Sequence, residues 1–176
     1  MANRQALREL QTRLADRLSV AKKQGVAASW LAVETNSIKY LLPLTHSGEI
    51  FPWASVQTVP YTQTWFIGVA NLRGGLFGVV DLASFVSGQH PKVKNDLEKA
   101  DSRLVLLNNA LDVNCALLVD KLSGLRNQLA FKDFNEKSAD SPVYFGNSYI
   151  DMNNYVWQEI NLQLLAQQVN FLTISN

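Results

Sequence analysis

Residues 68–82 read Gly-Val-Ala-Asn-Leu-Arg-Gly-Gly-Leu-Phe-Gly-Val-Val-Asp-Leu, and this stretch predicts a β-hairpin. Apolar runs at 65–70 and 76–80 flank a polar break at Asn71, Arg73, Gly74 and Gly75. Two apolar runs around a short glycine-containing break are typical of antiparallel strands joined by a tight turn. The turn carries one arginine between apolar walls and holds no nucleophile or metal ligand. It therefore suits contact with another protein better than catalysis.

The rest of the chain predicts a mainly β protein. Short apolar runs separated by turn residues recur from Trp30 to Ile160, which is typical of barrels or a sandwich. The polar stretch 87–102 reads as a solvated loop after a short helical turn at 83–86, and a second polar stretch covers 132–142. Helices are expected at the two ends. The first is an amphipathic helix within 1–28, and the second follows Ile160 and leads into an apolar tail.

Composition and charge exclude several classes of protein. The chain has 176 residues, 47% of them hydrophobic and 18% charged, with a net charge of +1, so no global charge favours nucleic acid. No stretch of 18 apolar residues could span a membrane, and no secretory signal opens the chain, which favours a cytoplasmic protein. Cys115 is the single cysteine, so neither a disulfide scaffold nor a cysteine zinc site is expected.

The positive charge is concentrated in the first 28 residues. They hold six Lys or Arg and two acids, a net of +4, whereas the remainder has a net of −3. Leucines at steps of three and four form one apolar stripe along this segment. Such a basic amphipathic helix packs on its own domain or a partner, or lies on an anionic membrane surface.

A search for catalytic groups favours a protein that is not an enzyme. His46 lies beside Ser47 and near Glu49, but adjacent His and Ser side chains rarely form a base–nucleophile pair. Asp81 closes an apolar run before a short helix and reads as a helix N-cap. An enzyme using His46, Glu49 and Asp81 in one cleft stays as an alternative. The glycines after Arg73 match no phosphate-binding motif. We expect no cofactor and no metal.

Four aromatic residues gather around a proline-containing loop. Trp53, Tyr61, Trp65 and Phe66 could be exposed anchors for a partner or members of the core. Core packing is the preferred interpretation for Trp65 and Phe66, and the two interpretations are even for Trp53.

Several motifs together resemble the CheW family of chemosensory adaptors. They are Glu49-Ile50, Val59-Pro60, the run from Trp65 to Gly74, Val79-Val80-Asp81-Leu82, and Ala116 to Gly124. The resemblance covers about residues 29–168, and the sequence of these motifs is most similar to that of the twitching-motility branch. It implies two packed five-stranded SH3-like β-barrels. The expected organisation is an N-terminal helical extension at 1–28, the CheW-like domain at 29–168 and a C-terminal tail at 169–176.

The resemblance also implies a function. Such adaptors join a CheA-type histidine kinase, through its regulatory domain, to the cytoplasmic tip of a methyl-accepting chemoreceptor at inner-membrane arrays, without direct membrane insertion. Here the implied process is type IV pilus twitching motility, with a flagellar chemotaxis array as the alternative. The residues implied at the receptor or kinase interface are Glu49, Asn71, Arg73 and Gly74. Arg73 either contacts a partner or pairs internally with Glu49.

Overall fold

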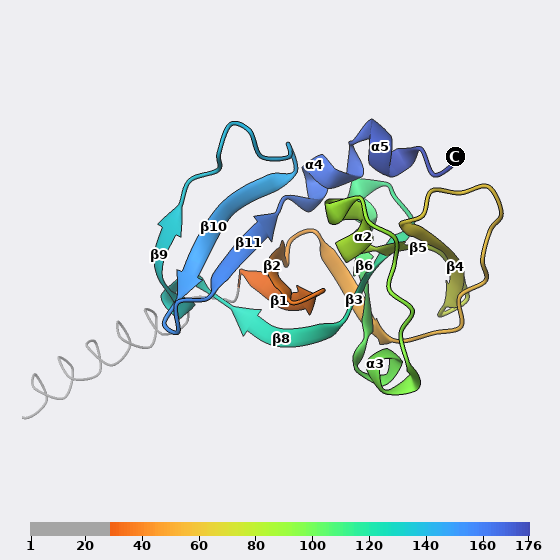
Figure 1. Ribbon diagram of the computed structural model, residues 1–176, viewed down its shortest axis with the longest axis horizontal. Helices are drawn as coiled ribbons and strands as arrows, with labels where there is room; N and C mark the ends of the chain where they lie inside the picture. The colour runs from red at the N-terminus through yellow and green to blue at the C-terminus, as the bar shows by residue number, and fades with distance from the viewer. Residues whose placement is uncertain (1–28) are drawn as a thin grey trace, which may run out of the picture.

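The computed structural model describes residues 29–176, and it is mainly β (Figure 1). The predicted amphipathic helix within 1–28 lies outside the described residues. Eleven strands are found in the described part of the chain. They are β1 Trp30–Thr35, β2 Ile38–Pro43, β3 Ser47–Pro52, β4 Phe66–Leu72, β5 Gly75–Asp81, β6 Arg103–Leu107, β7 Cys115–Val119, β8 Lys121–Arg126, β9 Phe131–Asn135, β10 Phe145–Asp151 and β11 Val156–Ile160.

The strands form two mixed sheets, which confirms the predicted fold class. One is six-stranded in the order β8-β1-β2-β11-β10-β9, and the other is five-stranded in the order β3-β6-β7-β5-β4. Most pairs are antiparallel, but β11 runs parallel to β2 and β5 runs parallel to β7. The resemblance implied five strands in each unit. The first sheet has one strand more.

The five-stranded sheet curls until its two edges meet. Strands β3 and β4 are at opposite edges of that sheet. The chain that continues from β3 reaches β4 at Gln57, which exchanges two backbone hydrogen bonds of 2.8 and 2.9 Å with Val69. This isolated bridge connects the segment after β3 to β4 and brings the two edges of the sheet close together.

The hairpin predicted at 68–82 is present as β4 and β5. Its register pairs Leu72 with Gly75, so Arg73 and Gly74 form a two-residue loop. Both loop residues have positive φ, 51° at Arg73 and 80° at Gly74. Positive φ at both positions is the signature of a type I′ turn, whose twist matches that of the flanking strands.

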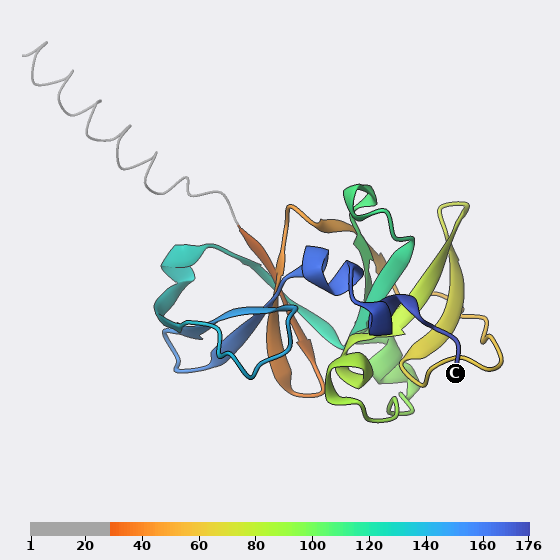
Figure 2. The ribbon, with the colours of Figure 1, turned by 90° about the horizontal axis from the view of Figure 1, so that it is seen from above.

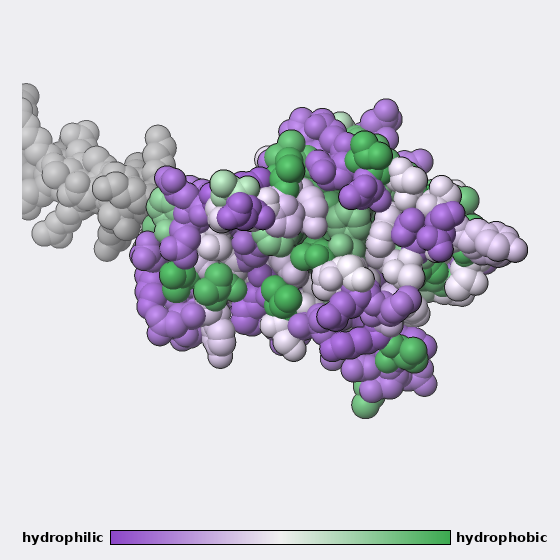
Figure 3. Space-filling model, turned by 45° about the horizontal axis from the view of Figure 1, so that its top comes forward, coloured by the Kyte–Doolittle hydropathy of each residue, from purple (hydrophilic) through white to green (hydrophobic). Residues whose placement is uncertain are grey.

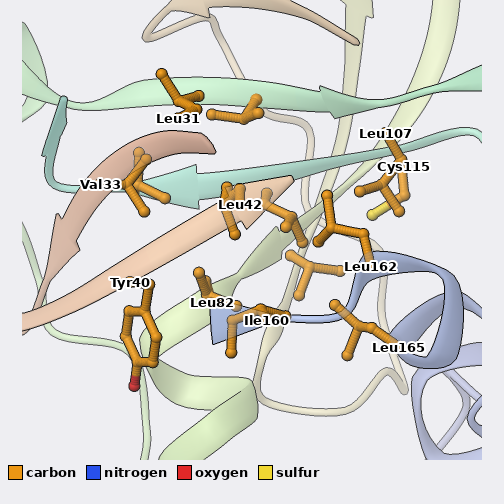
Figure 4. Packing of buried hydrophobic residues seen from close by; sticks show 14 of the residues in the cluster. Leu31, Val33, Tyr40, Leu42, Leu82, Leu107, Cys115, Ile160, Leu162 and Leu165 are labelled. Atoms are coloured by element: carbon orange, nitrogen blue, oxygen red, sulfur yellow. The ribbon is translucent and has the colours of Figure 1, made fainter. Parts of the chain in front are cut away.

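Alternate residues of the central strands enter different cores. Strand β7 is buried on both faces. Leu117 belongs to the core between the two sheets, whereas Ala116 and Leu118 face the interior of the five-stranded sheet. Figure 4 shows the core between the sheets, where side chains from both sheets converge with Leu162 and Leu165 of the C-terminal segment. The period of two along a strand produces this division.

Four α-helices occur in residues 29–176, namely α2 Leu82–Ser87, α3 Asp96–Asp101, α4 Leu162–Ala166 and α5 Val169–Leu172. The helices after Ile160 confirm the predicted C-terminal helix, divided in two. Short 3-10 turns, η1 Asn109–Leu111 and η2 Gln128–Ala130, link strands. None of the helices in the described region is long and apolar enough to cross a membrane.

The two polar stretches of the sequence contain regular structure. Helix α3 interrupts 87–102, because Asn95 and Glu98 form a reciprocal capping box at its start. In Figure 3 it projects from the body as a mostly hydrophilic protrusion. Strand β9 occupies the start of 132–142 and pairs with β10. The prediction of a loop over 87–102 was therefore wrong where α3 forms.

Candidate functional site

An ion pair between Glu49 and Arg73 spans the junction of the two sheet edges. Glu49 lies on β3 and Arg73 in the β4–β5 turn, 24 residues apart in sequence. Nη1 of Arg73 donates to Glu49 Oε1 at 2.9 Å and lies 2.8 Å from Oε2. The side chains are 73% and 55% exposed. Because water screens such a pair, its contribution to folding is about 0–1 kcal/mol.

Two further residues hold the arginine in place. Oδ1 of Asn71 accepts a hydrogen bond of 2.9 Å from the backbone N–H of Gly74, which closes the turn. The Phe51 ring lies under the guanidinium, with 5.7 Å between Arg73 Cζ and the ring centroid. A cation over an aromatic face gains about 0.5–1 kcal/mol at an exposed site. The turn and the ring therefore restrict Arg73 even though it is largely exposed.

The ion pair stands at the rim of a cleft of about 340 Å³. Its walls combine apolar and amide side chains with the charged pair. The lining residues are Gly48, Glu49, Phe51, Leu72, Arg73, Gly75, Phe77, Leu106, Leu107, Asn108 and Asn109. An apolar floor beside a charged rim suits a protein segment that presents an apolar side chain next to a hydrogen-bond acceptor.

Arg73 keeps donors available for such an acceptor. Glu49 engages Nη1 alone, and within residues 29–176 neither Nε nor Nη2 of Arg73 has a hydrogen-bond partner. The guanidinium is a planar fork that can bind a carboxylate or a carbonyl through the remaining donors. The Glu49–Arg73 pair and a contact with a partner are therefore compatible.

The residues of the enzyme alternative do not share a site. Glu49 lines the cleft just described, whereas Asp81 lines another one with residues of the 87–94 loop. Oδ1 of Asp81 accepts 2.8 Å from the N–H of Ser84, which confirms the predicted N-cap. His46 lies in the turn before β3, and its buried Nδ1 has no hydrogen-bond partner in the described structure. No group therefore orients the ring as a general base.

Other chemistry is equally unsupported in this part of the molecule. No group of three or more His, Cys, Asp or Glu among residues 29–176 could hold a metal ion. Cys115 is buried, as expected, and burial raises the pKa of its thiol to about 12. Such a thiol is a poor nucleophile near neutral pH.

The four aromatic residues near the proline loop have different environments. Phe66 is buried, and Trp65 packs against the same core and stacks on Phe171 with 6.1 Å between centroids. Trp53 packs partly into the five-stranded barrel. Tyr61 is 89% exposed. Core packing is thus confirmed for Trp65 and Phe66, and Tyr61 alone of the four projects into solvent.

Phe51 was the site residue that the sequence prediction missed. It lies two positions after Glu49 on β3, so the two side chains share a face of the strand. That spacing was available in the sequence and could have pointed to it. Asn108 and Asn109 reach the same cleft from the turn after β6, which no local pattern indicates.

Comparison with known proteins gives concordant matches. The chain is 26% identical over 141 residues to Protein PilI of Pseudomonas aeruginosa, covering 77% of this chain and 74% of that protein. The fold resembles the scaffolding protein TtCheW from Thermoanaerobacter tengcongensis, with a TM-score of 0.63 and 18% identity over 84% of this chain and 97% of that chain. The model of the CheW-like domain matches residues 29–169. The chain therefore belongs to the CheW-like domain family.

Proposed function

We propose that this protein is a non-catalytic adaptor that couples a transmembrane methyl-accepting chemoreceptor to a CheA-type histidine kinase. The process proposed for it is the control of type IV pilus twitching motility, in the cytoplasm at receptor arrays of the inner membrane. Membership of the CheW-like family supports an adaptor, and the similarity to Protein PilI supports the pilus branch. An adaptor of a flagellar array is the second candidate.

The observation that carries the proposal is the cleft beside the Glu49–Arg73 pair. It joins an exposed cation with unused donors to an apolar floor formed in part by Phe51 and Phe77. Contacts of this kind bind a protein segment without any chemical step. We assign this cleft, with Glu49, Asn71, Arg73 and Gly74, to the receptor.

Co-sedimentation with both purified partners tests the coupling. A receptor cytoplasmic fragment in vesicles is expected to retain the kinase only when the adaptor is present. Arg73→Glu is expected to lower adaptor binding to the receptor fragment about tenfold or more, since a hydrogen bond to a charged group contributes roughly 1.5–3 kcal/mol.

Lys99→Glu is the matched control, because it makes the same charge change on the exposed helix α3. It should leave binding unchanged. Equal losses for Lys99→Glu and Arg73→Glu would indicate a general charge effect and remove the cleft assignment. A kinase that reaches the vesicles without the adaptor would contradict the coupling role.

Comparing receptors separates the two candidate arrays. The proposed branch requires tighter binding to the receptor of the pilus system than to one of a flagellar system. The reverse preference would favour the flagellar alternative.

A further inference from the structure

Two long stretches of this chain hold no charged side chain. Residues 50–72 and 160–176 contain no Asp, Glu, Lys, Arg or His, in a protein in which 18% of residues are charged. A buried segment explains such a composition without any partner. Here, however, both stretches contribute exposed residues, so burial within the domain does not account for the absence of charge.

The two uncharged stretches lie side by side. Figures 1 and 2 both place the C-terminal tail against the loop that precedes β4. The N–H of Gln63 donates to the carbonyl of Ile174 at 2.7 Å, and the N–H of Asn176 donates to the carbonyl of Tyr61 at 3.0 Å. The Gln63 side chain adds a third hydrogen bond of 3.0 Å, to the carbonyl of Ser175. The tail and the loop therefore form one surface, which we call the uncharged surface.

Large apolar side chains are exposed across the uncharged surface and the adjacent hairpin. They are Val59, Tyr61, Leu76, Val169, Leu172 and Ile174. Three of them, Leu76, Leu172 and Ile174, line a hollow of about 280 Å³ together with residues of β4, β5 and the start of β7, and none of its lining residues is charged. Protein interfaces are depleted of charge at their centres and enriched in tyrosine. The uncharged surface lacks charge and exposes one tyrosine, Tyr61.

Tyr61 is the most exposed large apolar side chain of the uncharged surface and does not itself line the hollow. Its side chain is 89% exposed, and its φ of 59° is one that residues with a Cβ rarely adopt. The hydrogen bond from Asn176 fixes the backbone of Tyr61 to the tail. A large aromatic side chain held in solvent at some cost in backbone strain is consistent with a role in binding.

We propose that the uncharged surface binds a second copy of this chain in a twofold dimer, with Tyr61 of each copy in the hollow of the other. A twofold interface must be complementary to itself, and a surface with one projection and one hollow meets that condition. Two uncharged faces meet without repulsion or the cost of burying charge. The hollow leaves room for a ring, since cavities of roughly 150 Å³ hold benzene.

The dimer leaves the Glu49–Arg73 cleft open. Leu76 of β5 lines the hollow, whereas the next residue, Phe77, lines the cleft. Successive side chains of a strand point to opposite faces. The proposal is therefore independent of the function proposed for the cleft.

Sedimentation equilibrium of the full chain over roughly 1–100 μM, a range set by the affinity scale of modest interfaces, tests the proposal directly. The chain is expected to dimerise reversibly. Tyr61→Ser and Leu172→Ser should each raise the dimer dissociation constant, Tyr61→Ser by about 30-fold, as for removal of an aromatic hot spot. Tyr61→Phe should retain most of the association, because it keeps the ring.

Two controls distinguish the uncharged surface from other sites. Leu97→Ser removes a leucine on helix α3 that is 82% exposed, against 53% for Leu172, and Arg73→Glu alters the cleft; neither should change the dissociation constant of the dimer. Circular dichroism checks that each variant is folded. A chain that stays monomeric throughout the range overturns the proposal, as does association that Tyr61→Ser and Leu172→Ser leave unchanged. A monomer whose binding to a CheA-type kinase is lost in Tyr61→Ser would assign the surface to that partner instead.

Discussion

Exchanging the charges of Glu49 and Arg73 separates two roles that the ion pair can have. In the double variant Glu49→Arg with Arg73→Glu, a pair of opposite charges still spans β3 and the β4–β5 turn. If the pair acts only as an internal lock, the exchange restores it. If Arg73 offers its free donors to a receptor, the exchange places a carboxylate where the partner requires a donor.

The expected sizes of the two effects differ enough to be measured. With side chains 73% and 55% exposed, the pair contributes at most about 1 kcal/mol to the free energy of unfolding. For a domain of this size that is a shift of about 2–4 °C in Tm. Loss of a charged hydrogen bond to a partner costs about 1.5–3 kcal/mol, or roughly 10- to 150-fold in Kd.

The assay pairs thermal unfolding with titration calorimetry against a receptor cytoplasmic fragment. Arg73→Glu alone and the double variant should both bind at least about tenfold more weakly, by the same reasoning, while the melting temperatures of both stay near that of the wild type. Recovery of wild-type affinity in the double variant would refute a direct contact by Arg73. A loss of stability well beyond 1 kcal/mol in Arg73→Glu, recovered in the double variant, would show that the pair is a structural lock.

The remaining predictions concern stability and reactivity. Gly68→Ala should unfold the domain or lower its free energy of unfolding by more than about 3 kcal/mol, because the new Cβ would lie 2.2 Å from the carbonyl oxygen of Gln57. For Gly74→Ala, where nothing lies within 4 Å of the new Cβ, urea denaturation should show a loss of only about 1–2 kcal/mol. Burial tends to raise the pKa of Glu34, but hydrogen bonds from two lysines and a serine outweigh it and hold the pKa below its ordinary value of 4.5. The contribution of ionised Glu34 to the free energy of unfolding should be complete above pH 4.5 and should be lost as the pH falls through the lowered pKa. Acid denaturation curves of Glu34→Gln should lack this contribution. Because burial raises the pKa of Cys115 to about 12, a thiol reagent at pH 8 should label it only after unfolding, and rapid labelling of the native protein would contradict its burial.

The β4–β5 hairpin could be predicted from sequence because its information is local. Gly74 tolerates positive φ, and Asn71 supplies an acceptor for the N–H three residues later, so the turn is encoded within a few positions. Helix α3 was equally local, since Asn95 and Glu98 form a recognisable capping box. It was overlooked because the surrounding residues are polar and no apolar periodicity supports a helix there.

The cleft could be predicted only in part. The pairing of Glu49 with Arg73 depends on the curling of the five-stranded sheet, which brings together strands from its opposite edges. The curling in turn depends on Gln57 meeting Val69, a bridge that no short-range pattern indicates. The aromatic residues show the same limit, since Trp65 and Tyr61 are close in sequence but only Tyr61 is exposed. Composition identifies candidates for an interface, whereas tertiary packing decides which of them reach solvent.

The β4–β5 hairpin contributes residues to both of the proposed binding surfaces. Its turn holds Arg73 at the cleft, and Leu76 at the start of β5 lines the hollow of the uncharged surface. Because the turn is locked by its own hydrogen bond from Gly74 to Asn71, neither surface depends on the other for its shape. A dimer formed through Tyr61 would therefore present two intact clefts. If receptors are clustered, two linked clefts bind more tightly than one, because the second contact is made at a high effective concentration.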